Sequence, residues 1–311
     1  MPLNILFAAR PERWAQYQPP LDAAFAEVGL ADYTLSTDIP AEDVDYIVYA
    51  PNSELQDFTP YTRAKAVLNL WAGVEDITRN KTLIQPLARM VDDGLERGMV
   101  EWVTGHTLRH HLGTDAHVLG QDGTWRHDVP PLAKDRPVTI LGLGALGRAC
   151  ADALGQIGFP VTGWSRSQKD IPGVACFSGE AGLLRALENA QIVILLLPDT
   201  PQTEKVINAE TLTALPAGAF LINPGRGPLI DDDALLAALD TGRIAHATLD
   251  VFRIEPLPAD HPFWAHPKVT VTPHIASETR PETAARVVAD NIRRGEAGEP
   301  FLHLVDRDLG Y

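Results

Sequence analysis

The sequence predicts an α/β protein built from two lobes, each with a largely parallel sheet. Short apolar runs rich in β-branched residues alternate with helical patterns along most of the chain, and such alternation is typical of parallel sheets. The chain has 311 residues, 45% of them apolar, and chains of this length rarely keep a single hydrophobic core. The alternation is interrupted after about residue 100, so we expect one sheet on either side of that point.

The spacing of apolar residues along the chain predicts where the strands and helices lie. The expected strands are Asn4–Ala8, Tyr46–Tyr49, Ala66–Leu70, Val138–Leu141, Val161–Trp164, Ile192–Leu197, Ala219–Asn223, Ala245–Leu249 and Val269–Thr272. The expected helices include Met99–Leu112, Ala145–Ile157, Asp232–Leu239 and Glu278–Arg294. A polar loop, Gly120–Pro137, follows the first of these helices, and a loop of that length is usually a linker or a surface excursion.

Composition narrows the class of protein. The formal net charge is −15, which repels phosphate backbones and argues against nucleic acid as a partner. The same charge repels small carboxylates, so a site for them needs local positive charge. Cys150 and Cys176 form neither a disulfide framework nor a zinc spacing, which fits a reducing, cytoplasmic compartment. Met1–Arg10 lacks the features of a signal peptide, and Ile192–Leu197 is too short to span a bilayer.

A glycine motif follows the Val138–Leu141 run directly and opens a helical stretch. It consists of Gly142, Leu143, Gly144, Ala145, Leu146 and Gly147. In this context Gly142 permits the tight turn, Gly144 lets the backbone approach a pyrophosphate, and Gly147 lets helix and strand pack closely. The helix N-terminus then offers N–H groups to the phosphates. We therefore expect a Rossmann-like dinucleotide site, the alternative being a glycine-rich turn without a ligand.

The next strand ends at Ser165-Arg166-Ser167, where an NAD-preferring site usually carries an acidic residue. Arg166 can pair with a 2′-phosphate, and the two serines can donate to it. This predicts NADP(H) as the preferred cofactor, with NAD(H) as the alternative and a solvated turn arginine as the bland interpretation. Pro198 and Thr203, in the loop after Ile192–Leu197, are further candidates for cofactor contacts, although an ordinary turn with a threonine cap would look the same.

Three later segments make the pattern more specific. They are Leu221-Ile222-Asn223-Pro224-Gly225-Arg226-Gly227, Leu249-Asp250-Val251-Phe252-Arg253-Ile254-Glu255-Pro256-Leu257 and Thr272-Pro273-His274-Ile275-Ala276. With the glycine motif, they resemble the D-isomer-specific 2-hydroxyacid dehydrogenase family over essentially the whole chain. Trp164–Ser167 and the C-terminal Val305–Tyr311 look like its glyoxylate/hydroxypyruvate reductase A subgroup. One departure is Trp71, where many relatives carry a small residue, and it leaves the size of the substrate pocket open.

The resemblance implies reduction of a small 2-oxo acid, and the residue types fit that chemistry. His274 titrates near neutrality and would donate the proton to the keto oxygen. Glu255 would accept from its other ring nitrogen, fix the tautomer and raise the imidazole pKa. Arg226 would hold the substrate carboxylate with its planar fork.

The same resemblance assigns the remaining contacts. The turn formed by Trp71, Ala72, Gly73 and Val74 would offer backbone N–H groups to the substrate carboxylate. Asp250 would face the nicotinamide, and Pro224 and Gly225 would line the cofactor.

The resemblance also implies the domain organisation and the assembly. A cofactor domain, residues 101–272, would be inserted in a discontinuous substrate-binding domain, residues 1–100 and 273–311, and the protein would be a homodimer. His106 and His110 are spaced i,i+4, but no glutamate follows His106, so we expect no metal site. Two alternatives stay open: a dehydrogenase for another 2-oxo acid, and a non-catalytic dinucleotide-sensing protein.

Overall fold

The computed structural model describes residues 2–307, 309 and 310 and divides into two compact units. Unit 1 consists of Met1–Leu95 and Glu278–Tyr311, and unit 2 is the continuous segment Glu96–Ser277. Each unit contains one sheet in which every paired strand is parallel, so the predicted α/β class with two parallel sheets is confirmed. The sequence placed the two divisions at residues 100 and 272, and the structure has them at 95 and 277.

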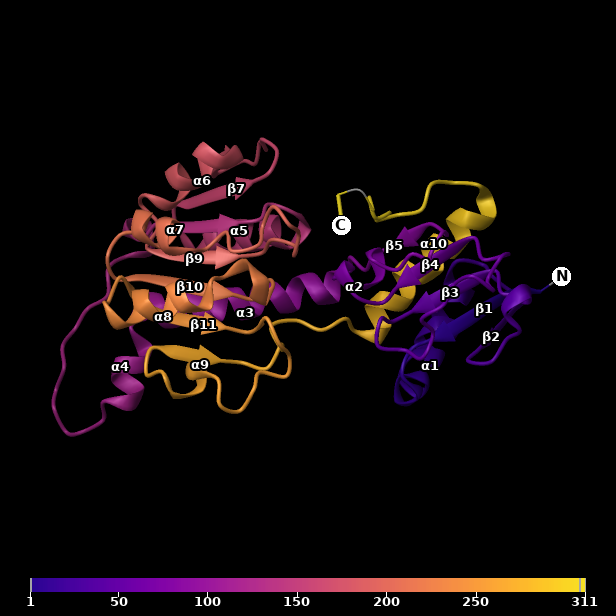
Figure 1. Ribbon diagram of the computed structural model, residues 1–311, viewed down its shortest axis with the longest axis horizontal. Helices are drawn as coiled ribbons and strands as arrows, with labels where there is room; N and C mark the ends of the chain where they lie inside the picture. The colour runs from indigo at the N-terminus through magenta and orange to yellow at the C-terminus, as the bar shows by residue number, and fades with distance from the viewer. Residues whose placement is uncertain (1, 308, 311) are drawn as a thin grey trace. The chain divides into compact units, whose positions relative to one another are not determined.

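Unit 1 is built on a five-stranded sheet with the order β2-β1-β3-β4-β5 (Figure 1). Its strands are β1 (Leu3–Ala8), β2 (Tyr33–Ser36), β3 (Tyr46–Tyr49), β4 (Ala66–Asn69) and β5 (Leu87–Ala88). Its helices are α1 (Pro11–Glu27), a 3₁₀ turn η1 (Ala41–Asp43), the short α2 (Glu75–Thr78) and α10 (Pro281–Ala297). The apolar face of α10 packs with α1 and one face of the sheet into a core, and a second core lies on the other face.

Unit 2 is built on a seven-stranded sheet with the order β12-β11-β10-β9-β6-β7-β8. Its strands are β6 (Val138–Leu141), β7 (Val161–Ser165), β8 (Val174–Ser178), β9 (Ile192–Leu195), β10 (Ala219–Asn223), β11 (Ile244–Leu249) and β12 (Val269–Val271). Its helices are α4 (Thr114–Leu119), α5 (Ala145–Ile157), α6 (Gly179–Leu187), α7 (Ala209–Ala214), α8 (Asp232–Asp240) and α9 (Pro262–Ala265), with 3₁₀ turns η2 (Ala133–Asp135) and η3 (Gly227–Leu229). The long helix α3 (Asp93–Leu112) contains the division between the units.

The central strands of unit 2 are buried on both faces, which explains their nearly continuous apolar sequence. Every residue of β6 and β9 is buried. The polar exceptions find partners: Thr139 donates to the Ala186 carbonyl at 2.8 Å, and Thr248 lies 2.9 Å from Nε2 of the buried His110. The core therefore fixes β6, β9 and β10 rigidly, and their carboxyl ends carry the loops described below.

Three strands were missed, and the start of α3 lies six residues earlier than the sequence predicts. Other ends shift by one to three residues, as in α10, which was expected at Glu278–Arg294 and spans Pro281–Ala297. β2, β5 and β8 were missed because they are short or only partly buried strands at sheet edges, where the apolar pattern is weak. α3 begins six residues before the predicted Met99, where the backbone N–H of Leu95 donates to the carboxylate of Asp92. Gly94 and Gly98, which have low helix propensity, conceal this start in the sequence.

A segment with unusually many exposed apolar side chains follows α3. Figure 1 shows the chain after α4 running out from unit 2 in a long loop before it returns to β6. The exposed residues of this segment are Leu112, Val118, Leu119, Trp125, Val129 and Leu132, with Trp125 92% exposed. We call residues 112–132 the arm. None of the helices in the described part of the chain has the length and apolar character needed to cross a lipid bilayer.

Candidate active site

The glycine motif forms a tight βα turn at the end of β6. Gly142 has φ +111°, and a Cβ there would lie 2.4 Å from the Leu196 carbonyl oxygen. A Cβ on Gly147 would lie 1.8 Å from the Gly142 carbonyl oxygen, whereas one on Gly144 would meet nothing within 4 Å. Two of the glycines are thus required by internal packing, and the third leaves open space over the N-terminus of α5. That combination fits a dinucleotide pyrophosphate.

The turn after β7 has one buried and two exposed members. Ser165 is buried and donates its hydroxyl proton to the Ser167 carbonyl at 2.8 Å, which shapes the turn. Arg166 and Ser167 are exposed. Positive charge and a hydroxyl therefore lie at the surface of the turn, with Ser165 beneath them.

The loop after β9 is held by its own threonines. Thr203 Oγ1 donates to the Pro198 carbonyl at 2.7 Å and accepts from the Thr200 backbone N–H at 2.9 Å. Both threonines are buried. Thr203 therefore acts first as the cap of this turn, the alternative that the sequence left open, and it fixes where Pro198 lies.

The loop that carries Arg226 is organised by Asn223, which is fully buried at the end of β10. Asn223 accepts from the Gly225 N–H at 3.1 Å and donates to the Arg226 carbonyl at 2.9 Å. Arg226 Nη1 donates to the Gly225 carbonyl at 2.7 Å. A Cβ on Gly227 would lie 1.9 Å from the carbonyl carbon of Phe252, so this loop presses against the backbone that leads to Glu255.

His274 and Glu255 form a direct pair. His274 Nδ1 lies 2.7 Å from Glu255 Oε2, while Glu255 Oε1 accepts from the Phe252 N–H at 2.8 Å. Both carboxylate oxygens are thus engaged, and the orientation of the imidazole is fixed through Nδ1. The His274 side chain is 51% exposed, and Nε2 is the ring nitrogen that Glu255 does not engage.

The surroundings of His274 and Glu255 shift their pKa values in opposite directions. The hydrogen bond that His274 donates to the Glu255 carboxylate raises the pKa of His274 above its usual value, while burial and the charge of Arg226 act against that shift. Burial alone would raise the pKa of Glu255, but hydrogen bonds from His274 and from Phe252, with the charge of Arg226, lower it on balance. At neutral pH the carboxyl group is therefore ionised and the imidazole is favoured in its protonated form.

Asp250 holds the turn that presents His274. Its carboxylate is completely buried and accepts from the Thr272 hydroxyl at 2.6 Å and from the backbone N–H groups of Ile275 and Ala276 at 2.9 and 2.8 Å. The Asp250 carbonyl accepts from the His274 N–H at 2.8 Å. His274 has φ +55°, a left-handed conformation that few non-glycine residues adopt, and these bonds stabilise it.

In unit 1, the turn predicted to bind a carboxylate follows β4. Asn69 is buried at the end of that strand and donates to the carbonyls of Trp71 and Gly73 at 2.8 and 3.1 Å. Because these carbonyls are turned toward Asn69, the turn is fixed as a compact unit. Trp71 is 39% exposed, while Val74 is buried.

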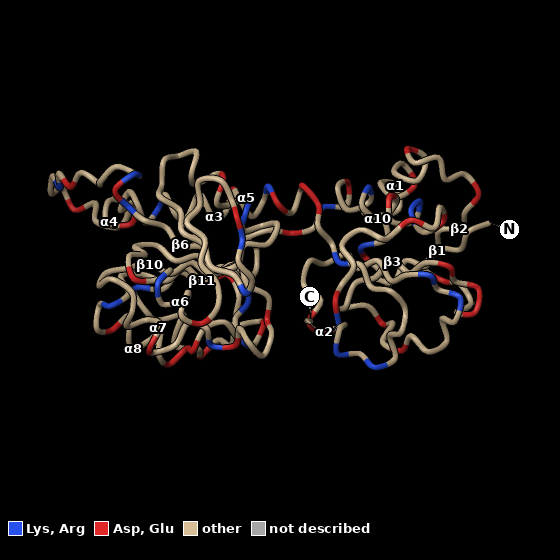
Figure 2. Tube along the Cα trace, turned by 90° about the horizontal axis from the view of Figure 1, so that it is seen from above, with Lys and Arg blue, Asp and Glu red and all other residues tan. Residues whose placement is uncertain are grey.

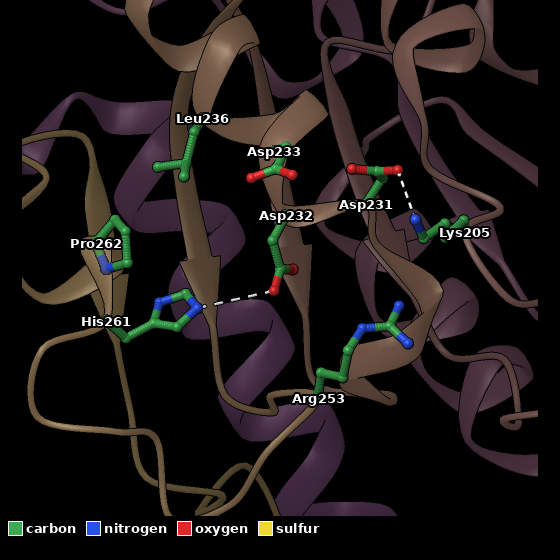
Figure 3. A pocket seen from close by; sticks show the side chains of 8 residues that line it. All are labelled: Lys205, Asp231, Asp232, Asp233, Leu236, Arg253, His261 and Pro262. Carbon is green, nitrogen blue, oxygen red and sulfur yellow. Dashed lines mark ion pairs between the residues drawn. The ribbon is translucent and has the colours of Figure 1, made fainter.

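A pocket of about 270 Å³ lies elsewhere on unit 2, around the N-terminus of α8 (Figure 3). Its charges are mostly paired: Lys205 lies 3.0 Å from Asp231, and His261 lies 3.8 Å from Asp232. Asp231 caps α8, because its side chain accepts a hydrogen bond from the Ala234 N–H. None of the predicted site residues lines this pocket, and its acidic residues serve the helix start.

The histidines with i,i+4 spacing are occupied by packing. His110 stacks on Phe220 with 4.7 Å between ring centroids, and burial lowers its pKa to about 3. His106 lies against Trp102. Among the described residues no group of three or more potential ligands could hold a metal ion.

Comparisons with known proteins identify the family. The model of the D-isomer specific 2-hydroxyacid dehydrogenase NAD binding domain matches residues 104–276. The glyoxylate/hydroxypyruvate reductase A of Serratia proteamaculans is 40% identical over 283 residues, covering 88% of this chain and 90% of that protein. The chain belongs to the D-isomer specific 2-hydroxyacid dehydrogenase family.

Solved structures of family members are similar to this chain over its whole length. The D-isomer specific 2-hydroxyacid dehydrogenase of Xanthobacter autotrophicus, in complex with NADPH and MES, has a TM-score of 0.93 and 39% identity, covering 100% of both chains. The NADPH-dependent glyoxylate/hydroxypyruvate reductase of Sinorhizobium meliloti, in complex with NADP and sulfate, has a TM-score of 0.86 and 33% identity, covering 100% of this chain and 99% of that one. The predicted resemblance to the 2-hydroxyacid dehydrogenases and their reductase A subgroup is confirmed.

The structure adds residues that sequence reasoning did not single out. Asn69, Asn223 and Thr272 each fix a turn of this dehydrogenase that carries a candidate functional group. For the two asparagines, a buried amide at the end of a parallel strand was an available signal. The sequence contained no such signal for Thr272, because its hydrogen-bond partner Asp250 lies 22 residues away in the chain.

Proposed function

We propose that this dehydrogenase reduces a small 2-oxo acid, glyoxylate or hydroxypyruvate, to the 2-hydroxy acid with NADPH. The observation that carries the proposal is the 2.7 Å His274–Glu255 pair within the electrostatic reach of Arg226. The relatives named glyoxylate/hydroxypyruvate reductase A and the relatives solved with NADPH or NADP support both the substrate class and the cofactor.

The chain's own residues supply everything except the hydride, which the bound NADPH provides. Protonated His274 donates from Nε2 to the keto oxygen, and Glu255 stabilises the imidazolium and keeps Nδ1 engaged. Arg226 binds the carboxylate of the oxo acid and polarises the carbonyl. By the family resemblance, we also assign the backbone N–H groups of Ala72, Gly73 and Val74 of unit 1, beside Trp71, to the substrate carboxylate.

We assign the cofactor contacts to the loops at the carboxyl ends of the unit 2 strands. Gly142, Gly144, Ala145, Leu146 and Gly147 would receive the pyrophosphate, with the open space over Gly144 in support. Arg166 and Ser167 would bind the 2′-phosphate, with Ser165 shaping their turn. Pro198 and Thr203, Pro224 and Gly225, and Asp250 would line the remainder.

The direct test follows oxidation of NADPH and NADH by the purified protein with glyoxylate, hydroxypyruvate and pyruvate. We expect turnover with the first two acids and a higher kcat/KM for NADPH than for NADH. A clear NADH preference would refute the assignment of Arg166. Turnover only on bulkier 2-oxo acids would indicate another dehydrogenase of the family, and cofactor binding without turnover on a wide panel would indicate a dinucleotide sensor.

The His274–Glu255 pair predicts a specific pH dependence. Reduction needs protonated His274, so kcat/KM should fall as pH rises through the pKa of that imidazole. Glu255 raises this pKa, and Glu255→Gln removes the charge that does so. We expect the high-pH limb of the Glu255→Gln profile to move to lower pH relative to the wild type. If the limb stays in place, Glu255 does not act on the protonation of His274.

We also propose a cytoplasmic homodimer in which the arm contributes to the interface. The support is the number of exposed apolar side chains on residues 112–132, because extensive exposed apolar surface usually marks a protein contact. Acidic residues are distributed over both units (Figure 2), in keeping with the net charge of −15 and against nucleic acid as a partner. Sedimentation velocity should show a dimer that Trp125→Asp weakens, and a monomeric wild type would refute this assembly.

A further inference from the structure

Arg89 is a half-buried arginine in unit 1 that has no function in the proposal above. It follows β5 directly, and burial lowers its pKa, an effect that the negative charge of Glu75 partly opposes. Among the residues that the structure describes, none accepts a hydrogen bond from its guanidinium or forms an ion pair with it. The other titratable neighbour is His303, whose pKa is lowered by burial and by the charge of Arg89, so its uncharged form is favoured.

Burying a side chain of this kind without hydrogen-bond acceptors costs free energy. A guanidinium withdrawn from water loses hydration, and the loss is recovered only when acceptors replace the water. Arg307, in the same unit, shows the ordinary solution, because it donates to the backbone carbonyls of Leu83 and Gln85. Among the described residues no such acceptor faces Arg89, so its five N–H donors are available to a ligand.

The backbone around Arg89 is held firmly on both sides. The Arg89 N–H donates to the His303 carbonyl at 3.0 Å, and the next residue, Met90, donates to the Trp71 carbonyl at 3.0 Å. β4 and β5 are parallel neighbours with Leu68 opposite Ala88. Arg89 therefore leaves the same edge of the sheet as the Trp71–Val74 turn, at the carboxyl ends of the strands, where ligands of α/β sheets bind.

The effect of Glu75 on Arg89 indicates that the Arg89 guanidinium lies on the side of the Trp71–Val74 turn. Glu75, which acts on the Arg89 charge, is the residue immediately after Val74. Under the proposed function, the N–H groups of this turn bind the substrate carboxylate. An additional cation beside the turn is then left for the next part of the substrate.

We propose that Arg89 is a specificity-determining residue that binds the substituent on carbon 3 of the oxo acid. The group recognised is a hydroxyl or an anionic oxygen, as in hydroxypyruvate, and glyoxylate has no carbon 3. This inference rests on the proposed function, since it concerns the same substrate site. Arg89 would thus favour three-carbon hydroxylated acids over the two-carbon acid.

The test compares the wild type with Arg89→Met and Arg89→Lys on hydroxypyruvate and glyoxylate. We expect Arg89→Met to lower kcat/KM for hydroxypyruvate by roughly tenfold to a hundredfold, the range for a lost hydrogen bond to a charged group. For glyoxylate we expect a change of less than about threefold, since no contact is lost. Arg89→Lys, which keeps a charge without the planar fork, should lie between.

A stability measurement separates this role from a structural one. Removing an unpaired, desolvated charge should leave the melting temperature of Arg89→Met equal to or above that of the wild type. The matched control is Arg307→Met, which breaks two backbone contacts of the same unit. It should lower the melting temperature and leave the ratio of the two substrates unchanged.

A binding measurement keeps the inference testable without turnover. In the presence of NADP⁺, D-glycerate should stabilise the wild type against heat more than glycolate does, and Arg89→Met should abolish the difference. If the wild type reduces neither acid, the proposed function fails, and this comparison still tests Arg89. Equal losses for both acids, an unchanged substrate ratio, or a glycerate preference that survives in Arg89→Met would each overturn the assignment.

Discussion

Replacing His274 with asparagine should lower kcat by about 10²–10⁴-fold, the range for loss of a general acid. Asparagine is chosen because the residue has φ +55°, and asparagine adopts this region more readily than alanine does. The backbone bonds from Asp250 to the turn would then remain. The loss should therefore come from the missing proton donor and not from a displaced loop.

Cofactor affinity is the control for this variant. The glycine turn and the β7 turn do not involve His274, so the Kd for NADPH, measured by fluorescence, should stay within about twofold of the wild type. The rate of His274→Asn should also lose its high-pH limb, because the titrating group is gone. A variant that keeps the wild-type kcat would exclude His274 as the acid.

Gly227→Ala should be strongly damaging although it adds only a single methyl group. The added Cβ would lie 1.9 Å from the Phe252 carbonyl carbon and 2.3 Å from the Arg253 nitrogen, both backbone atoms that a rotamer change does not relieve. Overpacking costs about 1–3 kcal/mol or more, and a displacement of about 1 Å between reacting groups costs about 10²-fold in rate. We expect kcat/KM to fall by roughly that factor and the melting temperature to drop.

Gly105→Ala is the matched control. Gly105 lies inside α3, and a Cβ there would meet nothing within 4 Å. Alanine in a helix interior is favoured over glycine by about 1 kcal/mol, so this variant should be equally or more stable and fully active. If Gly227→Ala behaves like Gly105→Ala, the contact between the Arg226 and Glu255 loops does not position the site.

The sequence allowed the central part of the fold to be predicted but not its edges. β6 and β9 are buried throughout, and β10 is buried except for the half-buried Phe220. These strands are therefore mostly apolar, and their apolar runs identify them in the sequence. β8 has mostly half-buried residues, which resemble a loop in sequence. α1 contains Pro19 and Pro20, which argue against a helix locally, although packing against the sheet and α10 stabilises it.

In the candidate site, too, some residues could be predicted from the sequence and others could not. Arg226, Glu255 and His274 could be singled out because their residue types carry the chemistry and because the motifs resemble a family. The groups that orient them could not, since their contacts join distant parts of the chain. The bond from Thr272 to Asp250 and the approach of Gly227 to Phe252 exist only once the strands have assembled.

The place of α10 in the unit 1 core has a consequence for synthesis of the chain. Ala284, Val288 and Ile292 of this helix are buried together with residues of β1, β3 and α1, yet α10 is synthesised only after the whole of unit 2. Unit 2, which is continuous, can complete its core while translation proceeds. The apolar face of residues 1–95 that α10 covers therefore stays exposed until α10 has been synthesised. We expect a chaperone to bind this nascent N-terminal segment.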